Sequence, residues 1–240
     1  MGTAGKLTAL FLQARIDSTR LPGKVLLSLS GRRVIEHAML ALREIPADRH
    51  VLLTDHAGYE ALKPFTETCG FDLYRGPKDD VLARYAGAAR QYGADRIIRA
   101  TGDNPLVDPF LAADILRRHG EAGAHYSAYV GAPLGTGVEV VEAEALFRAE
   151  AEGRDPYERE HVTPFVYRRP EEFVIYRPRV PEPQFFPEGR VTLDTEADYA
   201  FLRIVFSRLY DGRPVSADTL VRWLKSPEGR RAASGDRAAS

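Results

Sequence analysis

A short polar loop near the start of the chain gathers cationic side chains at a spacing that suits phosphate. Arg15, Arg20 and Lys24 fall within ten residues, directly after the apolar run 7–13. A triphosphate carries about four negative charges, for which arginine offers paired donors and lysine a compact point charge. The loop therefore predicts a polyphosphate site, with a solvated basic loop as the alternative.

The loop matches neither of the common glycine-rich phosphate fingerprints. Lys24 is followed by Val25, which excludes G-x-x-x-x-G-K-[ST], and no G-x-G-x-x-G follows the first apolar run. The loop is therefore of a different kind, in which its amides and the Ser18 and Thr19 hydroxyls can add neutral donors to the cations.

Two distant aspartates share one sequence context. Asp103 closely follows the apolar run 96–100, and Asp194 follows the apolar run 191–193. Mg²⁺ commonly takes one or two carboxylates and completes its shell with phosphates and water. Because the ends of strands in a parallel sheet meet at one edge, we expect the two carboxylates to converge there and to form a metal site. Capping of the following helix is the alternative for each residue. That alternative is weaker for Asp103, because Asp108 is better placed to cap the next helix.

Strand and helix patterns alternate through the first half of the chain. Short apolar runs predict strands, and apolar residues three or four apart predict helices. Alternation of this kind is typical of an α/β fold with a mostly parallel sheet and helices on both faces. Ligands of such sheets bind beyond the carboxyl ends of the strands. We expect strands at 7–13, 51–54, 71–74 and 96–100, and helices at 34–44, 59–68, 80–92 and 108–119.

The second half of the chain is less regular. We expect one domain over residues 1–225, with an excursion at about 125–190, and a disordered tail at 226–240 because that segment is small and polar. The expected strands are 126–130, 138–141, 173–176 and 191–193, and the expected helices are 143–151, 157–167 and 196–210.

The composition restricts the classes of partner. Lys plus Arg total 33 and Asp plus Glu total 34 in 240 residues, so the chain lacks the basic excess of a general nucleic-acid binder. No apolar run approaches the ~20 residues that span a bilayer. Cys69, the single cysteine, has no partner for a disulfide or a thiolate metal site. We expect a cytoplasmic protein that binds neither nucleic acid nor membrane.

The loop at residues 13–24, the predicted phosphate loop, also resembles a known family. The stretch QARIDSTRLPGKVLLSLSGRRVIEH is similar to the opening of cytidylyltransferases, and R-x-x-S-T-R-L-P-x-K is its most specific part. The family includes 3-deoxy-manno-octulosonate and N-acylneuraminate cytidylyltransferases, and the best match is the spore coat polysaccharide biosynthesis protein F family. The resemblance covers roughly residues 7–210. It implies a Rossmann-like nucleotidyltransferase sheet and a loop that wraps the CTP phosphates.

The resemblance further implies roles for individual residues. The segments around Asp103 and Asp194 resemble GD-x-PL and L-D-T-x-x-D, whose aspartates bind Mg²⁺, with Mn²⁺ as a substitute. Residues 76–85 resemble G-x-x-DDVL-x-RY, a loop near the cytosine and ribose. The implied catalytic residues are Arg15, Lys24, Asp103 and Asp194, and the implied nucleotide-binding residues are Gln13, Ala14, Arg15, Arg20, Lys24, Asp80, Arg84 and Thr101.

Two features qualify these assignments. Asp80 could simply cap a helix and Arg84 could be a surface residue. Thr101 stands where the octulosonate and neuraminate enzymes usually carry glutamine. That departure favours the spore-coat branch and leaves those two sugar acids in doubt as substrates.

Two later segments resemble parts of the family that line the acceptor pocket or the dimer contact. They are GTGVE at 135–139 and REHVTP at 159–164. The resemblance implies Glu139, Arg159 and His161 as acceptor-binding residues, since a sugar-acid carboxylate needs a cation or backbone donors. A lone histidine on a helix is as often structural. The resemblance also implies a homodimer to which residues 157–176 contribute.

The expected reaction is transfer of CMP from CTP to an acidic acceptor, a sugar acid, with release of pyrophosphate. Two alternatives stay open. A glycosyltransferase with a similar sheet would usually show D-x-D after a strand, and Asp103 lacks that partner. A non-catalytic nucleotide-binding module would keep the loop but would not need paired metal aspartates.

Overall fold

The computed structural model describes residues 5–235 and confirms an α/β fold built on strand–helix alternation. The strands are β1 (Thr8–Gln13), β2 (Ser28–Leu29), β3 (Arg32–Arg33), β4 (Arg49–Thr54), β5 (Asp72–Arg75), β6 (Arg96–Thr101), β7 (Tyr126–Ala128), β8 (Glu139–Glu142) and β9 (Ile175–Tyr176). The α-helices are α1 (Val34–Leu42), α2 (His56–Cys69), α3 (Val81–Tyr92), α4 (Pro109–Ala122), α5 (Ala143–Glu152), α6 (Pro156–His161), α7 (Pro164–Tyr167), α8 (Glu196–Leu209), α9 (Ala217–Leu224) and α10 (Pro227–Ser234). Two 3₁₀ turns, η1 (Lys24–Leu26) and η2 (Glu182–Gln184), complete the set.

The central sheet has seven strands in the order β5-β4-β1-β6-β8-β7-β9. β1 pairs in parallel with β4 and β6, β4 pairs in parallel with β5, and only β8 runs against the others. The carboxyl ends of β1, β4, β5 and β6 therefore meet at one edge of the sheet. In the register of β1 and β6, Gln13 lies opposite Thr101. The loops that follow these strands thus start side by side.

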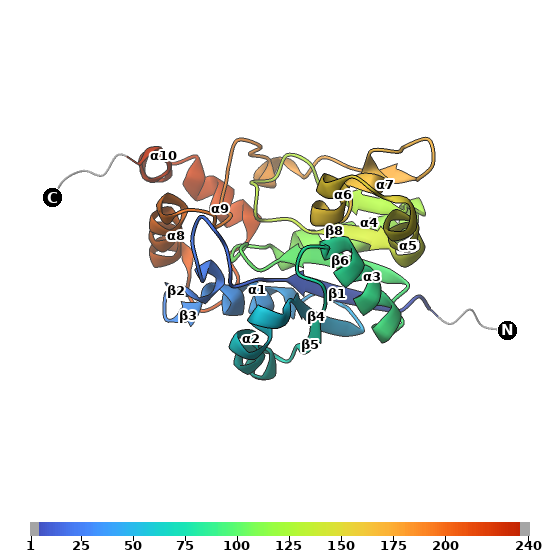
Figure 1. The fold of residues 1–240 in the computed structure, drawn as a ribbon. Coiled ribbons are helices and arrows are strands. Elements are labelled where there is room, and N and C mark those ends of the chain that lie inside the picture. Colours follow the sequence, from blue (N-terminus) through green and yellow to red (C-terminus); the bar gives the residue numbers. More distant parts are fainter. Residues whose placement is uncertain (1–4, 236–240) are drawn as a thin grey trace.

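Helices cover both faces of the sheet, as Figure 1 shows. The buried strand β1 explains why two layers form, because successive side chains point to opposite faces. Ala9 and Phe11 belong to the core beneath α3 and α5, whereas Leu10 and Leu12 belong to the core beneath α1, α2 and α4. An apolar run without polar interruption is what a strand covered on both faces requires.

The last helices form a third apolar cluster against the phosphate loop. Leu21 and Leu29 from the start of the chain pack with Leu193, Leu202 and Trp223 from its end. Figure 1 shows α8, α9 and α10 gathered on the side of the molecule where β2 and β3 lie. This packing brings the chain around Asp194 next to the phosphate loop.

The tail differs from its expected disorder. Residues 227–234 form α10, which Ser226 caps by accepting a hydrogen bond from the Gly229 amide. Arg208 of α8 contacts Glu228 at 2.7 Å, and Ala232 packs against the third cluster. Small polar composition concealed a capped helix with Pro227 at its first position, where proline is favourable. Residues 236–240 lie outside the described part of the chain.

The expected helix at 157–167 is broken into two. α6 ends at His161, Val162 adopts φ 75°, and α7 begins at Pro164. Proline has no amide hydrogen for the helix and disfavours helical backbone in the residue before it, so Pro164 favours a break at this point. The apolar pattern alone did not reveal the break.

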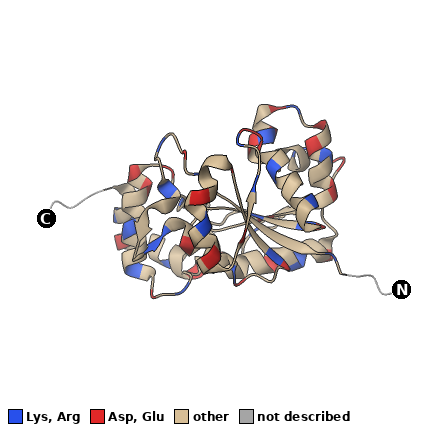
Figure 2. Ribbon diagram, turned by 60° about the horizontal axis from the view of Figure 1, so that its bottom comes forward, with Lys and Arg blue, Asp and Glu red and all other residues tan. Residues whose placement is uncertain are grey.

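Charged residues are distributed without one dominant sign. Figure 2 shows Lys and Arg interspersed with Asp and Glu along the helices, as expected from the nearly equal totals. Within residues 5–235, no helix is both long enough and apolar enough to cross a bilayer.

A buried polar network closes the amino edge of the sheet, far from the loops that follow β1 and β6. His119 of α4 contacts Ser127 through Nδ1 at 2.8 Å and Glu142 through Nε2 at 2.9 Å. Lys6 and Arg96 also donate to Glu142, at 2.6 and 2.8 Å. His119 and Ser127 are fully buried. A serine, histidine and glutamate in contact resemble a nucleophilic triad, but burial denies substrate any access, so the network is structural.

The network predicts a pH-dependent contribution to stability. Burial lowers the pKa of His119 from its ordinary value, against the opposing hydrogen bond with Glu142. Between pH 7 and pH 5 the unfolded chain therefore takes up a proton at this histidine that the folded chain does not, and the free energy of unfolding falls as the pH falls. The free energy of unfolding of His119→Gln should therefore fall less steeply over this range than that of wild type. The difference between the two slopes should be at most about 1.4 kcal/mol per pH unit. Urea unfolding at pH 7, 6 and 5 measures the difference, and parallel trends for the two proteins would contradict it.

Candidate functional site

The phosphate loop leaves β1 and turns back on itself before η1. Gly23 adopts the left-handed conformation, with φ 66°, and its amide donates to the Ile16 carbonyl at 2.9 Å. Glycine adopts this backbone without the steric cost that other residues incur. The turn directs the Lys24 side chain inward, so that only 10% of it is exposed.

The Lys24 ammonium lies between the two predicted aspartates. It donates to Asp103 Oδ2 at 2.6 Å, to Asp194 Oδ1 at 2.9 Å and to the Leu193 carbonyl at 2.8 Å. Each of its three hydrogens thus has an oxygen partner. Because both carboxylate oxygens contact one nitrogen, they are at most about 5.5 Å apart, which is close to the ~4.2 Å that a single Mg²⁺ with bonds of ~2.1 Å can span. The predicted convergence of Asp103 and Asp194 is confirmed.

Asp103 reaches this point through a tight turn after β6. The Gly102 amide donates to the Gln13 carbonyl at 2.7 Å. A Cβ at Gly102 would stand 2.6 Å from the Ile35 side chain and 2.9 Å from Ala14. Only glycine therefore lets the backbone after β6 approach the start of the phosphate loop so closely.

Asp194 arrives by a different route from the one expected. Residues 191–193 are not a strand of the sheet; the segment makes only an isolated bridge between Arg190 and Leu134. The Leu193 amide instead donates to the Asp103 carbonyl at 2.9 Å. This backbone hydrogen bond joins the two segments beside the aspartates, whereas the sequence pattern attributed their meeting to a common sheet edge.

Helix capping does not explain either aspartate. Thr195 is the N-cap of α8 and forms a reciprocal capping box with Asp198. Asp108 caps α4, accepting from the amides of Phe110 at 2.7 Å and Leu111 at 3.1 Å. Asp103 and Asp194 are thus free of the structural role that could have accounted for them.

Further cations converge on Asp194. Arg20 donates to Oδ1 at 2.8 Å and Arg190 to Oδ2 at 2.5 Å. Burial raises the pKa of Asp194, but the hydrogen bond and charge of Lys24, with Arg190 and Arg20, outweigh this and lower it below the ordinary value. Asp194 is therefore ionised at neutral pH. Arg190 was not predicted: its only sequence signal is a position four residues before Asp194, outside any helix.

The loop after β5 is tied to the phosphate loop. Lys78 forms an ion pair with Asp17, whose pKa is lowered by the Lys78 hydrogen bond. Arg15 is exposed and makes no ion pair with the residues that the structure describes, and Gln13 Oε1 is buried without a hydrogen-bond partner among them. The predicted nucleotide loops therefore meet, with donors and acceptors still available.

Asp80 has a clear structural task. Its Oδ1 accepts from the Ala83 amide at 2.9 Å and caps α3, and its Oδ2 accepts from Arg159 Nε at 3.0 Å. Arg159 also donates to the Glu150 carbonyl at 2.8 Å. The pair joins α3 to α5 and α6, so both side chains are engaged in packing contacts.

Arg84 is not the surface residue that the alternative supposed. It is 1% exposed, and Nη2 donates to the Lys78 carbonyl at 3.1 Å. Nε and Nη1 are buried without a partner among residues 5–235. Burial lowers the pKa of the guanidinium from its ordinary value. A buried cation with unused donors costs stability, so packing alone does not explain this arginine.

The three predicted acceptor residues do not lie in one cluster. Glu139 accepts from Arg99 at 2.5 Å, Tyr126 at 2.7 Å and Thr163 at 3.0 Å. Arg159 faces Asp80, as described above. His161 is exposed, with its ring 4.2 Å from the Tyr157 ring. Glu139 alone lies beside β6, opposite Arg99 in the register of β8.

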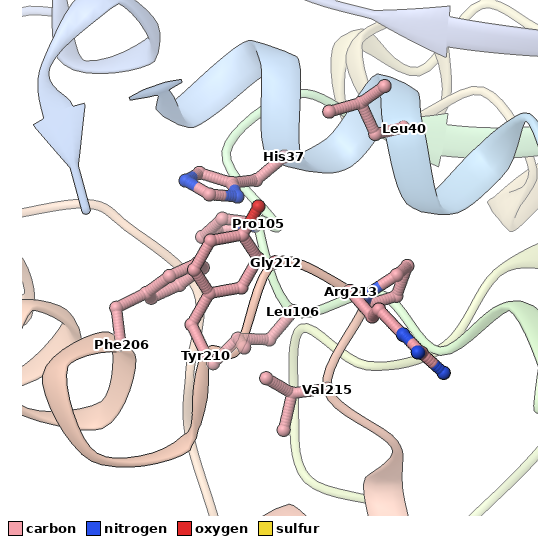
Figure 3. Close-up of a pocket in the computed structure, with 10 residues that line it drawn as sticks. His37, Leu40, Pro105, Leu106, Phe206, Tyr210, Gly212, Arg213 and Val215 are labelled. Carbon is pink, nitrogen blue, oxygen red and sulfur yellow. The ribbon is translucent and has the colours of Figure 1, made fainter. Parts of the chain in front are cut away.

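An enclosed cavity lies behind the aspartate site. Figure 3 shows it between α1 and the chain after α8, with His37, Phe206 and Tyr210 around it. Pro105 and Leu106, just after Asp103, line its floor. At about 30 Å³ it has room for one water. This cavity is therefore too small to hold a nucleotide.

The residues suited to a metal are the two carboxylates. Residues 5–235 hold no group of three or more His, Cys, Asp or Glu side chains placed to bind a metal ion. A divalent cation here would take Asp103 and Asp194 and would need oxygens from a ligand to complete its shell. This donor set fits Mg²⁺ bound together with phosphates.

Comparisons with known proteins identify the family to which the chain is similar. The family model described as Cytidylyltransferase matches residues 9–205. The chain is 32% identical over 220 residues to the spore coat polysaccharide biosynthesis protein SpsF of Bacillus subtilis, covering 89% of this chain and 92% of that protein.

Solved structures share the fold. A cytidylyltransferase from Leptospira borgpetersenii superposes with a TM-score of 0.85 at 24% identity, covering 98% of this chain and 99% of that one. A CMP:2-keto-3-deoxy-manno-octonic acid synthetase complexed with CTP superposes with a TM-score of 0.66 at 15% identity, covering 84% and 99%.

Arg84 yields a prediction that separates function from stability. Arg84→Met keeps an unbranched side chain and removes a buried, incompletely paired charge, so the melting temperature should stay the same or rise. If the free donors bind nucleotide, affinity for CTP should fall about tenfold or more. Differential scanning fluorimetry and isothermal titration calorimetry measure the two effects. A clear loss of melting temperature with unchanged CTP affinity would make Arg84 a packing residue.

Proposed function

The chain belongs to the cytidylyltransferase family, and from this premise we propose that it transfers CMP from CTP to an acidic acceptor, a sugar acid, and releases pyrophosphate. The observation that carries the proposal is the contact of Lys24 with Asp103 and Asp194. Arginines surround this pair at the carboxyl edge of the sheet. The cations can bind the phosphates of a nucleotide triphosphate, and the carboxylates can bind the divalent ion that accompanies it.

The metal site would consist of Asp103 and Asp194. Mg²⁺ bound there, or Mn²⁺ in its place, would neutralise charge on the phosphate oxygens and favour departure of pyrophosphate. The two carboxylates fit such an ion because they already converge on a single cation in this structure.

The other residues position the nucleotide. Lys24 and Arg20 are placed to bind phosphate oxygens once they leave the carboxylates, and exposed Arg15 can add a further contact. Arg84, with Gln13 and Thr101 nearby at the strand ends, would face the base and ribose. The acceptor hydroxyl attacks the α-phosphorus in line, and the bond from that phosphorus to the pyrophosphate oxygen breaks. Catalysis by such residues rests on orientation and charge neutralisation.

The acceptor would bind beside β6, near the α-phosphate. Glu139 holds Arg99 and Tyr126 at this position. Burial raises the pKa of Tyr126, which keeps its hydroxyl protonated. Arg159 and His161 both belong to α6. Of these, Arg159 would act by holding α3 and α6 in place, since Asp80 already occupies it.

We also propose that the protein works as a homodimer. Tyr157 and Val174, both within the segment 157–176, are large apolar side chains that are 43% and 49% exposed. A second copy is the occupant that the family resemblance favours for this surface. The similarity to a protein of spore coat polysaccharide biosynthesis suggests that the product serves polysaccharide assembly.

Pyrophosphate release tests the reaction. Wild-type protein with CTP, Mg²⁺ and a panel of sugar acids should release pyrophosphate with at least one acceptor, and much less with ATP, GTP or UTP. A coupled pyrophosphatase assay measures this, and mass spectrometry of the product identifies the CMP ester. A glycosyltransferase would consume a nucleotide sugar without releasing pyrophosphate. A protein that binds CTP but shows no turnover with any acceptor would be a non-catalytic nucleotide-binding module.

The metal dependence is a separate prediction. Chelation by EDTA should abolish turnover, and Mg²⁺ or Mn²⁺ should restore it. Asp103→Asn and Asp194→Asn should each lose several kcal/mol of transition-state stabilisation, which is more than about 100-fold in rate. Asp218→Asn changes an exposed carboxylate of α9 and serves as the matched control. Turnover by either site variant at more than a tenth of the wild-type rate would remove that residue from the metal site.

A further inference from the structure

Asp194 is held by cations that arrive from two directions. Arg20 belongs to the phosphate loop and contacts Oδ1, whereas Arg190 precedes Asp194 in the chain and contacts Oδ2. Lys24 completes the set on Oδ1. Both oxygens of Asp194 therefore have cationic partners, and a divalent ion would have to compete with these groups for the carboxylate.

The cations differ in depth. The side chain of Lys24 is 10% exposed, that of Arg190 43% and that of Arg20 64%. Lys24 lies deepest and alone contacts Asp103 as well. A triphosphate entering this site would therefore contact Lys24 through the phosphate that lies deepest in the site. Its more exposed phosphates would contact the two arginines.

The charges predict an exchange of partners. Lys24, Arg20 and Arg190 carry three positive charges against the two negative charges of Asp103 and Asp194. A triphosphate offers these cations more charge and more acceptor oxygens than the carboxylates do. Once the cations turn to phosphate, the carboxylates are free to bind a divalent ion.

We propose that Arg190 is a further phosphate-binding residue, which holds the pyrophosphate portion of the nucleotide, and that Arg190, Arg20 and Lys24 keep the metal site closed until nucleotide arrives. The inference rests on the proposed function and adds a residue and an order of events to it. It requires that nucleotide and metal each strengthen the binding of the other, because nucleotide binds the cations of these ion pairs and metal binds the carboxylates, so that each ligand frees the groups that the other needs.

The test compares Arg190→Gln with wild type in full-length protein. Pyrophosphate and CMP affinities are measured by isothermal titration calorimetry, and Mn²⁺ affinity without nucleotide by electron paramagnetic resonance. Loss of a charge-assisted contact should weaken pyrophosphate binding about tenfold or more, leave CMP binding within about twofold, and strengthen Mn²⁺ binding several-fold. Arg190→Lys keeps the charge and should retain most of the pyrophosphate affinity. Arg222→Ala removes an exposed arginine paired with Asp218 on α9 and should change none of these values.

Three results would overturn the inference. Unchanged pyrophosphate affinity in Arg190→Gln would remove its phosphate role while leaving the proposed reaction intact. Equal losses of pyrophosphate and CMP affinity, with a lower melting temperature, would show that Arg190 only supports the fold. A wild-type protein that binds no pyrophosphate even with Mn²⁺ would overturn both this inference and the proposed function.

Discussion

The Lys24 ammonium, shared by Asp103, Asp194 and the Leu193 carbonyl, is the interaction on which the candidate site depends. Its three partners come from two segments that are far apart in the chain, Asp103 after β6 and the adjacent pair Leu193 and Asp194. Its own position is set by the left-handed turn at Gly23. The central sheet places Lys24 and Asp103 side by side because β1 and β6 are neighbours. The C-terminal helices place Asp194 there by packing against Leu21 and Leu29.

An ion-pair cluster of this kind contributes little to the stability of the fold. Burying charges carries a desolvation cost that ion pairing offsets only in part, and apolar residues of similar size often stabilise a protein more. Arg84 adds to the cost, because two of its buried nitrogens have no partner in the part of the chain that the structure describes. The polar network of His119 and Glu142, at the other edge of the sheet, is in contrast fully paired. Unpaired or exchangeable charge is thus concentrated where a phosphate ligand would use it.

The sequence predicted the parts of this arrangement that depend on local pattern. The apolar run of β1 indicated a strand buried on both faces, and the cations after it indicated the phosphate loop. The meeting of Asp103 and Asp194 was also predicted, but for the wrong reason: a backbone hydrogen bond from Leu193, and not a strand in the sheet, brings them together. Arg190 was missed because its contact depends on how the segment before α8 folds back. The interruption at Val162 was missed because helical periodicity continues across it. The assignments of Arg15, Arg84, Glu139 and His161 to ligands stay predictions.

A crystal structure with CTP and Mn²⁺ would test the account most directly, because manganese is located by its anomalous scattering. The account predicts an anomalous peak bound by Asp103, Asp194 and phosphate oxygens. It also predicts that the Lys24 ammonium will have moved from between the carboxylates onto the phosphates. A structure in which CTP is bound while Lys24 still bridges Asp103 and Asp194, with manganese elsewhere, would contradict it.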